Sequence, residues 1–259
     1  MMAVGITCLA ELPAVFIFSA LEWPLIGLAI VTVIAAGTIQ GSTGFGFNMV
    51  AAPILALIDP AFVPVPMLLL AVAVCIVGAI RERDEIDRKG LTAALVGRTI
   101  ASGLAVFCLG LLDQGTYSTL FAGLVLLAVA LSLLGLKIEA NPRTLFVAGS
   151  VSGFMGTLTS IGAPPMTIPY QHSKGPVMRA TLSAFFVFGS FISVLALAAG
   201  GMVSWSAILL GLLLLPFAMI GFVFSNWGRM LVDKGKVRVV VLTVSTASAL
   251  LLVAREFLF

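Results

Sequence analysis

Two short polar stretches carry the side chains that could bind a solute. The first, residues 40–46, has the sequence Gln-Gly-Ser-Thr-Gly-Phe-Gly, and Asn48 follows it. The second, residues 159–165, has the sequence Thr-Ser-Ile-Gly-Ala-Pro-Pro. Hydroxyl, amide and backbone N–H groups bind small anions, above all where a helix begins with unpaired N–H groups. The candidate binding residues are therefore Gln40, Ser42, Thr43, Gly44, Phe45, Gly46, Asn48, Thr159, Ser160, Ile161 and Gly162.

The segments around both polar stretches are apolar enough to lie in lipid. Of 259 residues, 61% are hydrophobic and only 10% are charged, and the mean hydropathy is +1.20. Soluble domains are about half apolar and a quarter charged. A bilayer is crossed by roughly 20 apolar residues in a helix, and the stretches 64–80, 91–112, 116–136, 177–199, 204–224 and 239–253 approach that length. The composition predicts an all-α polytopic membrane protein.

Each polar stretch interrupts an apolar segment. The helix expected over 25–39 ends at Gln40 and the chain resumes over 47–58; the helix expected over 144–158 ends at Thr159 and resumes briefly to Tyr170. These pieces are too short to cross about 30 Å of hydrocarbon alone. Each pair is therefore either a broken helix that crosses once or a re-entrant hairpin that enters and leaves on one side.

The basic residues favour the hairpin. Twelve of the 14 Lys and Arg residues lie in four short connections, at 81–89, 137–143, 174–179 and 229–238. The positive-inside rule places such connections in the cytoplasm. All four lie there only if the segment from Arg143 to His172 starts and ends on the same side.

This topology predicts two inverted repeats, 24–136 and 137–259, each a re-entrant helical hairpin followed by three transmembrane helices. Residues 1–23 form a flanking segment, and both termini are expected outside. An offset of 116 positions aligns Gly37 with Gly153, and it also pairs Thr43 with Thr159, Gly46 with Gly162 and Pro53 with Pro169. Transporters built from such repeats bind substrate where their discontinuous helices meet. We therefore expect a small anion to lie between the two polar stretches.

Arg98 is the one basic residue well inside an apolar stretch. It either helps to guide the anion or extends its side chain to the cytoplasmic surface. Its equivalent in the second repeat is Leu214, so the repeat does not decide between these alternatives. His172, at the foot of the second hairpin, is either an interfacial anchor or a proton sensor. The cysteines, Cys8, Cys75 and Cys108, are far apart in apolar surroundings, and we expect no metal site and no cofactor.

The two polar stretches, the basic connection after the second hydrophobic element and the division into two halves resemble the TauE/SafE sulfite exporter family, from Trp23 onward. The resemblance implies a permease of the bacterial or archaeal inner membrane that handles sulfite, organosulfonates or related anions, commonly for export. Ile161 and Ala163 depart from the commoner Gly-x-Gly-Gly-Pro-like pattern of the second motif. That departure bears on the substrate more than on the fold.

The sequence thus predicts a secondary anion transporter with alternating access. An anion channel and a non-transporting membrane scaffold are the alternatives. The expected partners are a small anionic solute and the lipid bilayer, and homodimer formation stays open. Nucleic acid is not expected, because acidic and basic residues share the same loops. An enzyme is not expected, and intramembrane proteolysis in particular does not fit, because the apolar segments contain neither a serine in a Gly-x-Ser-Gly context with a histidine at membrane depth nor a pair of carboxylates.

Overall fold

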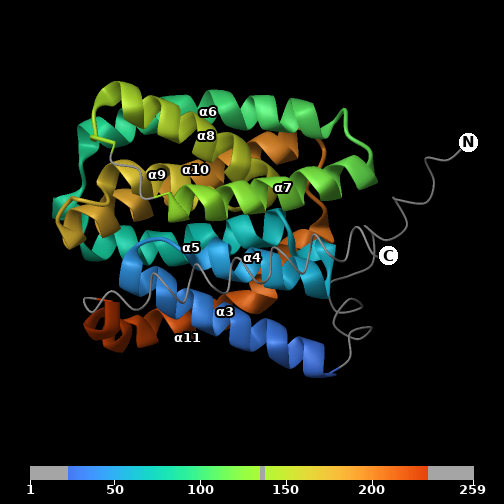
Figure 1. Ribbon diagram of the computed structural model, residues 1–259. Coiled ribbons are helices and arrows are strands. Elements are labelled where there is room, and N and C mark those ends of the chain that lie inside the picture. The colour runs from blue at the N-terminus through green and yellow to red at the C-terminus, as the bar shows by residue number, and fades with distance from the viewer. Residues whose placement is uncertain (1–22, 135–137, 233–259) are drawn as a thin grey trace, which may run out of the picture.

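The computed structural model describes residues 23–134 and 138–232, and every regular element within these ranges is a helix. The α-helices are α3 (Trp23–Thr43), α4 (Phe47–Ile58), α5 (Val65–Arg81), α6 (Arg88–Leu109), α7 (Gln114–Leu133), α8 (Pro142–Thr159), α9 (Ala163–Tyr170), α10 (Gly175–Ala199) and α11 (Trp205–Val232). Two 3-10 turns, η1 (Pro60–Phe62) and η2 (Arg83–Glu85), join them. The helices run roughly along one common direction (Figure 1). Residues 1–22 and the helix expected over 239–253 lie outside the described ranges.

Five described helices are long and apolar enough to cross a membrane: α3, α6, α7, α10 and α11. Helix α5, which we expected to span, has 17 residues and is apolar but shorter. Helix α11 continues beyond its predicted end at 224 as far as Val232. At 1.5 Å per residue, the 21 residues of α3 extend about 30 Å. The prediction that the first helix stops at Ile39 and is too short to cross is therefore wrong.

Helix α3 continues through the polar residues because their hydroxyls bond to its own backbone. Ser42 Oγ donates to Thr38 O at 2.7 Å, and Thr43 Oγ1 donates to Ile39 O at 2.9 Å. The helix ends only before Gly44, whose φ of 81° lies in the left-handed region that glycine adopts without steric cost. Gln40, Ser42 and Thr43 therefore belong to the last turn of a helix and not, as predicted, to irregular backbone.

The second hairpin has the same plan. Helix α8 ends at Thr159, and Ser160 takes a left-handed φ of 64°. Helix α9 begins at Ala163 with Pro164 and Pro165 in its first turn, as predicted, and ends at the predicted Tyr170. The ends of α3 and α8 are 116 positions apart, and so are the starts of α4 and α9. We call residues 43–47 the first tip and residues 159–163 the second tip.

Each long hairpin helix packs against a helix from the other half of the chain. Helix α3 lies along α11, and α8 lies along α6, while α5 and α10 pack against each other (Figure 1). The approach is close because it occurs at glycines. A Cβ on Gly37 would lie 2.4 Å from the carbonyl oxygen of Ala218, and a Cβ on Gly149 would lie 2.1 Å from that of Ala94.

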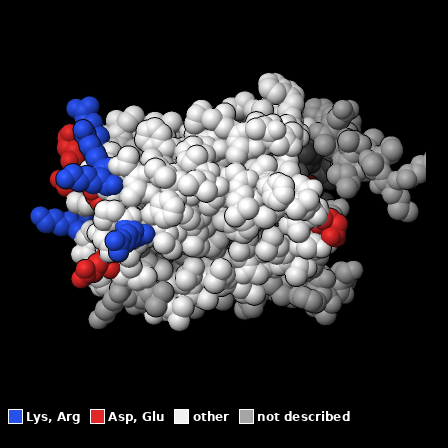
Figure 2. Space-filling view, turned by 90° about the horizontal axis from the view of Figure 1, so that it is seen from above, with Lys and Arg blue, Asp and Glu red and all other residues white. Residues whose placement is uncertain are grey.

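Lys and Arg side chains gather at one end of the molecule on the face that Figure 2 shows. We call this the basic end; there α5 ends and α6, α8 and α10 begin. Arg179 at the start of α10 pairs with Glu82 at 2.7 Å. The Tyr170 hydroxyl, at the end of α9, donates to Asp87 Oδ2 at 2.8 Å. Tyr170 and Leu145 both border Gly90, so the start of α8 and the end of α9 lie together.

Candidate functional site

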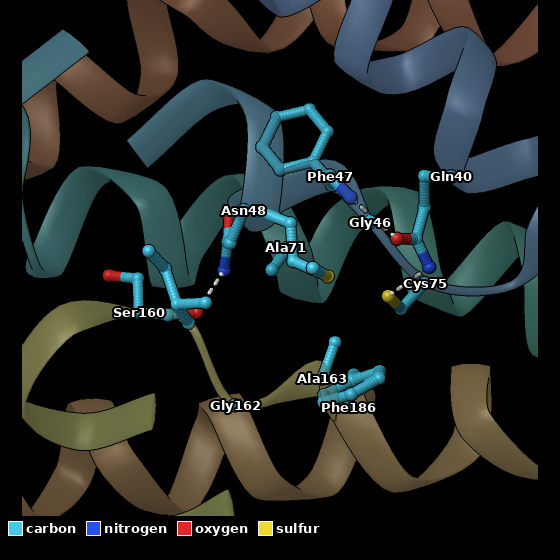
Figure 3. Close-up of a pocket in the computed structure, with 12 residues that line it drawn as sticks. Gln40, Gly46, Phe47, Asn48, Ala71, Cys75, Ser160, Gly162, Ala163 and Phe186 are labelled. Atoms are coloured by element: carbon cyan, nitrogen blue, oxygen red, sulfur yellow. Dashed lines mark hydrogen bonds between the residues drawn. The ribbon is translucent and has the colours of Figure 1, made fainter. Parts of the chain in front are cut away.

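A small cavity lies where the two tips meet (Figure 3). Both hairpins line it, together with α5 and α10. Its volume is about 20 Å³, enough for about one water molecule. The lining residues are Gln40, Gly46, Phe47, Asn48, Met49, Ala71, Cys75, Ser160, Ile161, Gly162, Ala163 and Phe186. The structure thus brings together six of the predicted candidates: Gln40, Gly46, Asn48, Ser160, Ile161 and Gly162.

Gln40 organises the first tip from the last turn of α3. Its Nε2 donates to Gly44 O at 2.9 Å and to Cys75 Sγ at 3.2 Å. Its Oε1 accepts from the backbone N–H of Phe47, the first residue of α4, at 3.2 Å. The side chain therefore serves as a cap for α4, whose preceding residue, Gly46, supplies no side-chain cap.

Asn48 joins the two tips. Its Nδ2 donates to the carbonyl oxygen of Ser160 at 2.9 Å, across the cavity (Figure 3). Its Oδ1 is buried and has no hydrogen-bond partner among residues 23–134 and 138–232. The Ser160 hydroxyl turns the other way and donates to Pro64 O at 2.9 Å. A buried acceptor thus lies beside the cavity, and a water molecule or a protonated ligand would satisfy it.

Thr43 and Thr159 perform the same task in the two tips, and neither lines the cavity. Each hydroxyl donates to the carbonyl four residues earlier, at 2.9 Å for Thr43 and 2.8 Å for Thr159. Each also accepts from the backbone N–H two residues later, at 3.2 Å from Phe45 and 3.1 Å from Ile161. The predicted donors of these two residues are therefore engaged within the tips themselves.

The remaining candidates of the first hairpin shape the tip without lining the cavity. Ser42 faces α11, where its hydroxyl also bonds to Ser225 O at 3.3 Å. Gly44 lies against the backbone of Arg179, and a Cβ there would come within 2.5 Å of the Arg179 Cα. Phe45 is partly buried against the apolar core.

Arg98 lies behind the second tip and not in the cavity lining. It is 1% exposed and bonds to Ser152 Oγ at 3.1 Å and to Ser193 Oγ at 3.4 Å. The alternative that its side chain extends to the membrane surface is therefore wrong. The side chain turns inward because α8 and α10 offer it hydroxyl acceptors.

The two half-helices differ in the N–H groups that they offer. Pro164 and Pro165 occupy the first turn of α9 and have no N–H. At α4, the N–H of Phe47 already bonds to Gln40. Neither helix start therefore offers a full set of free N–H groups to an anion, because prolines remove them from one and a glutamine engages one of the other.

Sequence reasoning missed half of the lining residues. Phe47, Met49 and Ala163 adjoin predicted candidates, and their place in a half-helix could have identified them. Ala71 and Cys75 of α5 and Phe186 of α10 carry no polar signal and reach the cavity only through tertiary packing. Within the described ranges, His, Cys, Asp and Glu side chains do not form any cluster that could hold a metal ion.

One comparison with known proteins gave a match. Residues 28–252 match the family described as "Sulfite exporter TauE/SafE", which is most of the chain. The comparisons with curated proteins and with solved structures gave no match.

Proposed function

The chain belongs to the TauE/SafE sulfite exporter family, and we propose from this that it is a secondary transporter of small sulfur oxyanions such as sulfite or organosulfonates. The anion is held in the cavity between the two tips. The observation that carries the proposal is the cavity lining, where polar groups from two distant parts of the chain meet among apolar helices. Meeting points of discontinuous helices hold the substrate in many secondary transporters.

The anion binds only after the tips move apart, because a cavity of about 20 Å³ has room for little more than a water molecule. Separation of the tips breaks the bond from Asn48 Nδ2 to Ser160 O and frees the amide N–H groups for an anion oxygen. The buried Asn48 Oδ1 accepts a hydrogen bond from the O–H group of a protonated oxyanion such as hydrogen sulfite. One amide thus offers a donor and an acceptor to the same ligand.

Two contacts close the cavity toward opposite ends of the molecule. At the basic end, the first tip lies against Arg179, which pairs with Glu82. Toward the other end, the Ser160 hydroxyl of the second tip bonds to Pro64 O at the start of α5. In alternating access, these two contacts are released in turn, so that the cavity opens first toward one end of the molecule and then toward the other. The protein lies in the inner membrane with its basic end facing the cytoplasm.

An inverted repeat underlies this mechanism, and each hairpin returns to the side from which it entered, although α3 by its length could reach across the membrane. The offset of 116 positions supports it, since that offset relates the helix ends of both hairpins. The matching bonds of Thr43 and Thr159 support it too. So does the exchange of partners, in which α3 packs on α11 while its equivalent α8 packs on α6.

The test is uptake by purified protein in liposomes. We expect saturable uptake of labelled sulfite that a two-carbon sulfonate inhibits better than acetate does. The variant Asn48→Leu, close to Asn in size, should abolish it, because it removes both polar groups from the cavity. Thr119→Val is the matched control, since it deletes an exposed hydroxyl of α7 that bonds to Gly115 O of its own helix.

Three outcomes would contradict the proposal. Folded protein that moves none of these anions favours the scaffold. Uptake that does not saturate, accompanied by a steady anion current across a planar bilayer, favours a channel. Wild-type uptake by Asn48→Leu would place the site elsewhere.

A further inference from the structure

Arg98 is the largest fully buried side chain in the described part of the protein. No carboxylate in the described ranges pairs with it. A buried charge is unfavourable unless it is paired, and ionisable residues inside membrane proteins commonly serve function. We propose that Arg98 determines the specificity of the cavity for anions, acting from behind the second tip. This inference rests on the proposed function.

The surroundings of Arg98 are built to hold a guanidinium. Its Nη1 and Nη2 donate to the hydroxyls of Ser152 and Ser193, and its Nε has no hydrogen-bond partner in the part of the chain that the structure describes. The guanidinium carbon lies 5.0 Å from the ring centre of Phe185 and 6.0 Å from that of Phe186. These partners are all neutral, so they bind the cation without cancelling its charge.

Glycines make room for the side chain. A Cβ on Gly189 of α10 would lie 2.0 Å from Arg98 Nε, and one on Gly156 of α8 would lie 3.3 Å from Nη2. A third glycine, Gly153, lets α8 approach the Arg98 backbone, where a Cβ would lie 2.8 Å from its Cα. An alanine at Gly189 would require the guanidinium to move.

Ser152 connects Arg98 to the cavity. Its hydroxyl accepts from Arg98 Nη1 at 3.1 Å and donates to the carbonyl oxygen of Gly162 at 2.5 Å. Gly162 and Phe186 both line the cavity. The hydroxyl thereby holds the Gly162 carbonyl toward the arginine, so this oxygen does not repel an anion in the cavity. The guanidinium adds a positive electrostatic potential to the cavity, from which Ser152 and Gly162 separate it.

The second tip needs this potential because its own backbone supplies little of it. Pro164 and Pro165 have no N–H groups with which to bind an anion. Arginine stays protonated at all physiological pH values, so its contribution is constant. In the second repeat, the position equivalent to Arg98 holds Leu214, which is fully buried. One buried arginine thus serves a cavity that both halves share.

The experiment compares a charged ligand with a neutral ligand of similar shape. Purified protein is titrated with methanesulfonate and with dimethyl sulfone, each in competition with labelled sulfite. Arg98→Met should weaken methanesulfonate binding by about tenfold or more relative to the sulfone, as expected for the loss of a nearby unit charge. Arg98→Lys keeps the charge and should retain most of the preference. Arg88→Met, which removes an exposed charge from the start of the same helix, should behave as wild type.

If Arg98→Met does not fold, Ser152→Ala provides the test, because it leaves the charge and removes the link to Gly162. It should lower the preference for methanesulfonate several-fold. Equal preference in the wild type and in a folded Arg98→Met or Ser152→Ala protein overturns the inference alone. A wild type that binds neither sulfite nor methanesulfonate overturns the proposed function, and the inference with it.

Discussion

The two tips share a threonine and one left-handed turn residue, and they differ in the side chains that pack behind them. Their backbones part at Gly46, whose φ is 107°, and its equivalent Gly162, whose φ is −111°. In each tip, a threonine hydroxyl bonds to the preceding helix turn and accepts the N–H two residues later. Each then turns through a left-handed residue, Gly44 in the first tip and Ser160 in the second. Behind the second tip lies a polar group of side chains, Arg98, Ser102, Ser152, Thr157 and Ser193, which hydrogen bonds connect.

Behind the first tip, the equivalent positions are apolar or small. They are occupied by Leu214, Ala218, Ala36, Gly41 and Val77. Leu214, Ala218 and Ala36 are fully buried. A cation does approach α3 there, since Arg81 donates to Gly41 O, but it binds a carbonyl at the basic end and is half-buried. The comparison teaches that the threonine bonds and the left-handed turn residue are duplicated while the buried charge is not.

The most severe test of this difference is to place a second arginine at position 214, among the apolar residues behind the first tip. Leu214→Arg should cost about 3 kcal/mol or more, because Ala36, Ala218 and Val77 offer no polar partner. Thermal unfolding in detergent would measure the loss, with Leu214→Met as the control for shape. A Leu214→Arg protein as stable as the wild type would mean that the two halves can support a charge equally.

Exchanging the left-handed residues sharpens the comparison of the tips. Gly44→Ser should destabilise by about 2–4 kcal/mol, because its Cβ would lie 2.5 Å from the Arg179 Cα in a conformation that L-residues avoid. Ser160→Gly should change stability by less than about 1 kcal/mol, since relief of the left-handed serine offsets loss of its bond to Pro64 O. Denaturation midpoints of the two variants measure both effects. Equal losses would contradict the difference in packing.

Filling the space that Gly189 leaves for the Arg98 side chain should have a smaller effect on stability. Gly189→Ala should cost about 1–3 kcal/mol, because the new methyl group would overlap the guanidinium. The equivalent residue in α5 is already alanine, and Ala73→Gly should cost only the helix propensity, about 0.5–1 kcal/mol. Unfolding curves of both variants decide this. A Gly189→Ala protein as stable as the wild type would show that the Arg98 side chain can move without cost.

The smallest expected difference is between the two threonines. Thr43→Val and Thr159→Val should each cost about 1 kcal/mol, because each removes the bond to the preceding helix turn and the bond from the N–H two residues later, although Thr43 also contacts Phe45 O. Their effects should agree within about 0.5 kcal/mol when thermal unfolding of the two proteins is compared. A large disagreement would break the equivalence of the tips.

Much of the hairpin plan followed from the sequence because apolar length and breaks are local properties. The half-helix over 47–58 and the end of α9 at Tyr170 are confirmed. The sequence predicts that the first helix ends before Gln40, because polar residues usually mark a break, but α3 continues to Thr43. Here Ser42 and Thr43 satisfy their hydroxyls on the carbonyls of their own helix, so they remain helical at no loss of hydrogen bonding.

The parts of the site that depend on distant packing could not be predicted. From its position along α6, the Arg98 side chain could extend to the membrane surface or turn inward. It turns inward because the hydroxyls of Ser152 and Ser193, on other helices, accept its hydrogen bonds. Phe186 and Cys75 enter the cavity because α5 and α10 pack together. The inverted repeat and the binding roles of the candidate residues stay predictions.

The most direct measurement of the central claim is to locate a bound anion. Selenite is the selenium analogue of sulfite, and crystals grown with it can be measured at the selenium absorption edge. Our account predicts one anomalous peak between Asn48 and Ser160, within the cavity that both tips line, with the tips further apart than in Figure 3. Selenite found only among the arginines of the basic end, in protein that takes up sulfite, would contradict it.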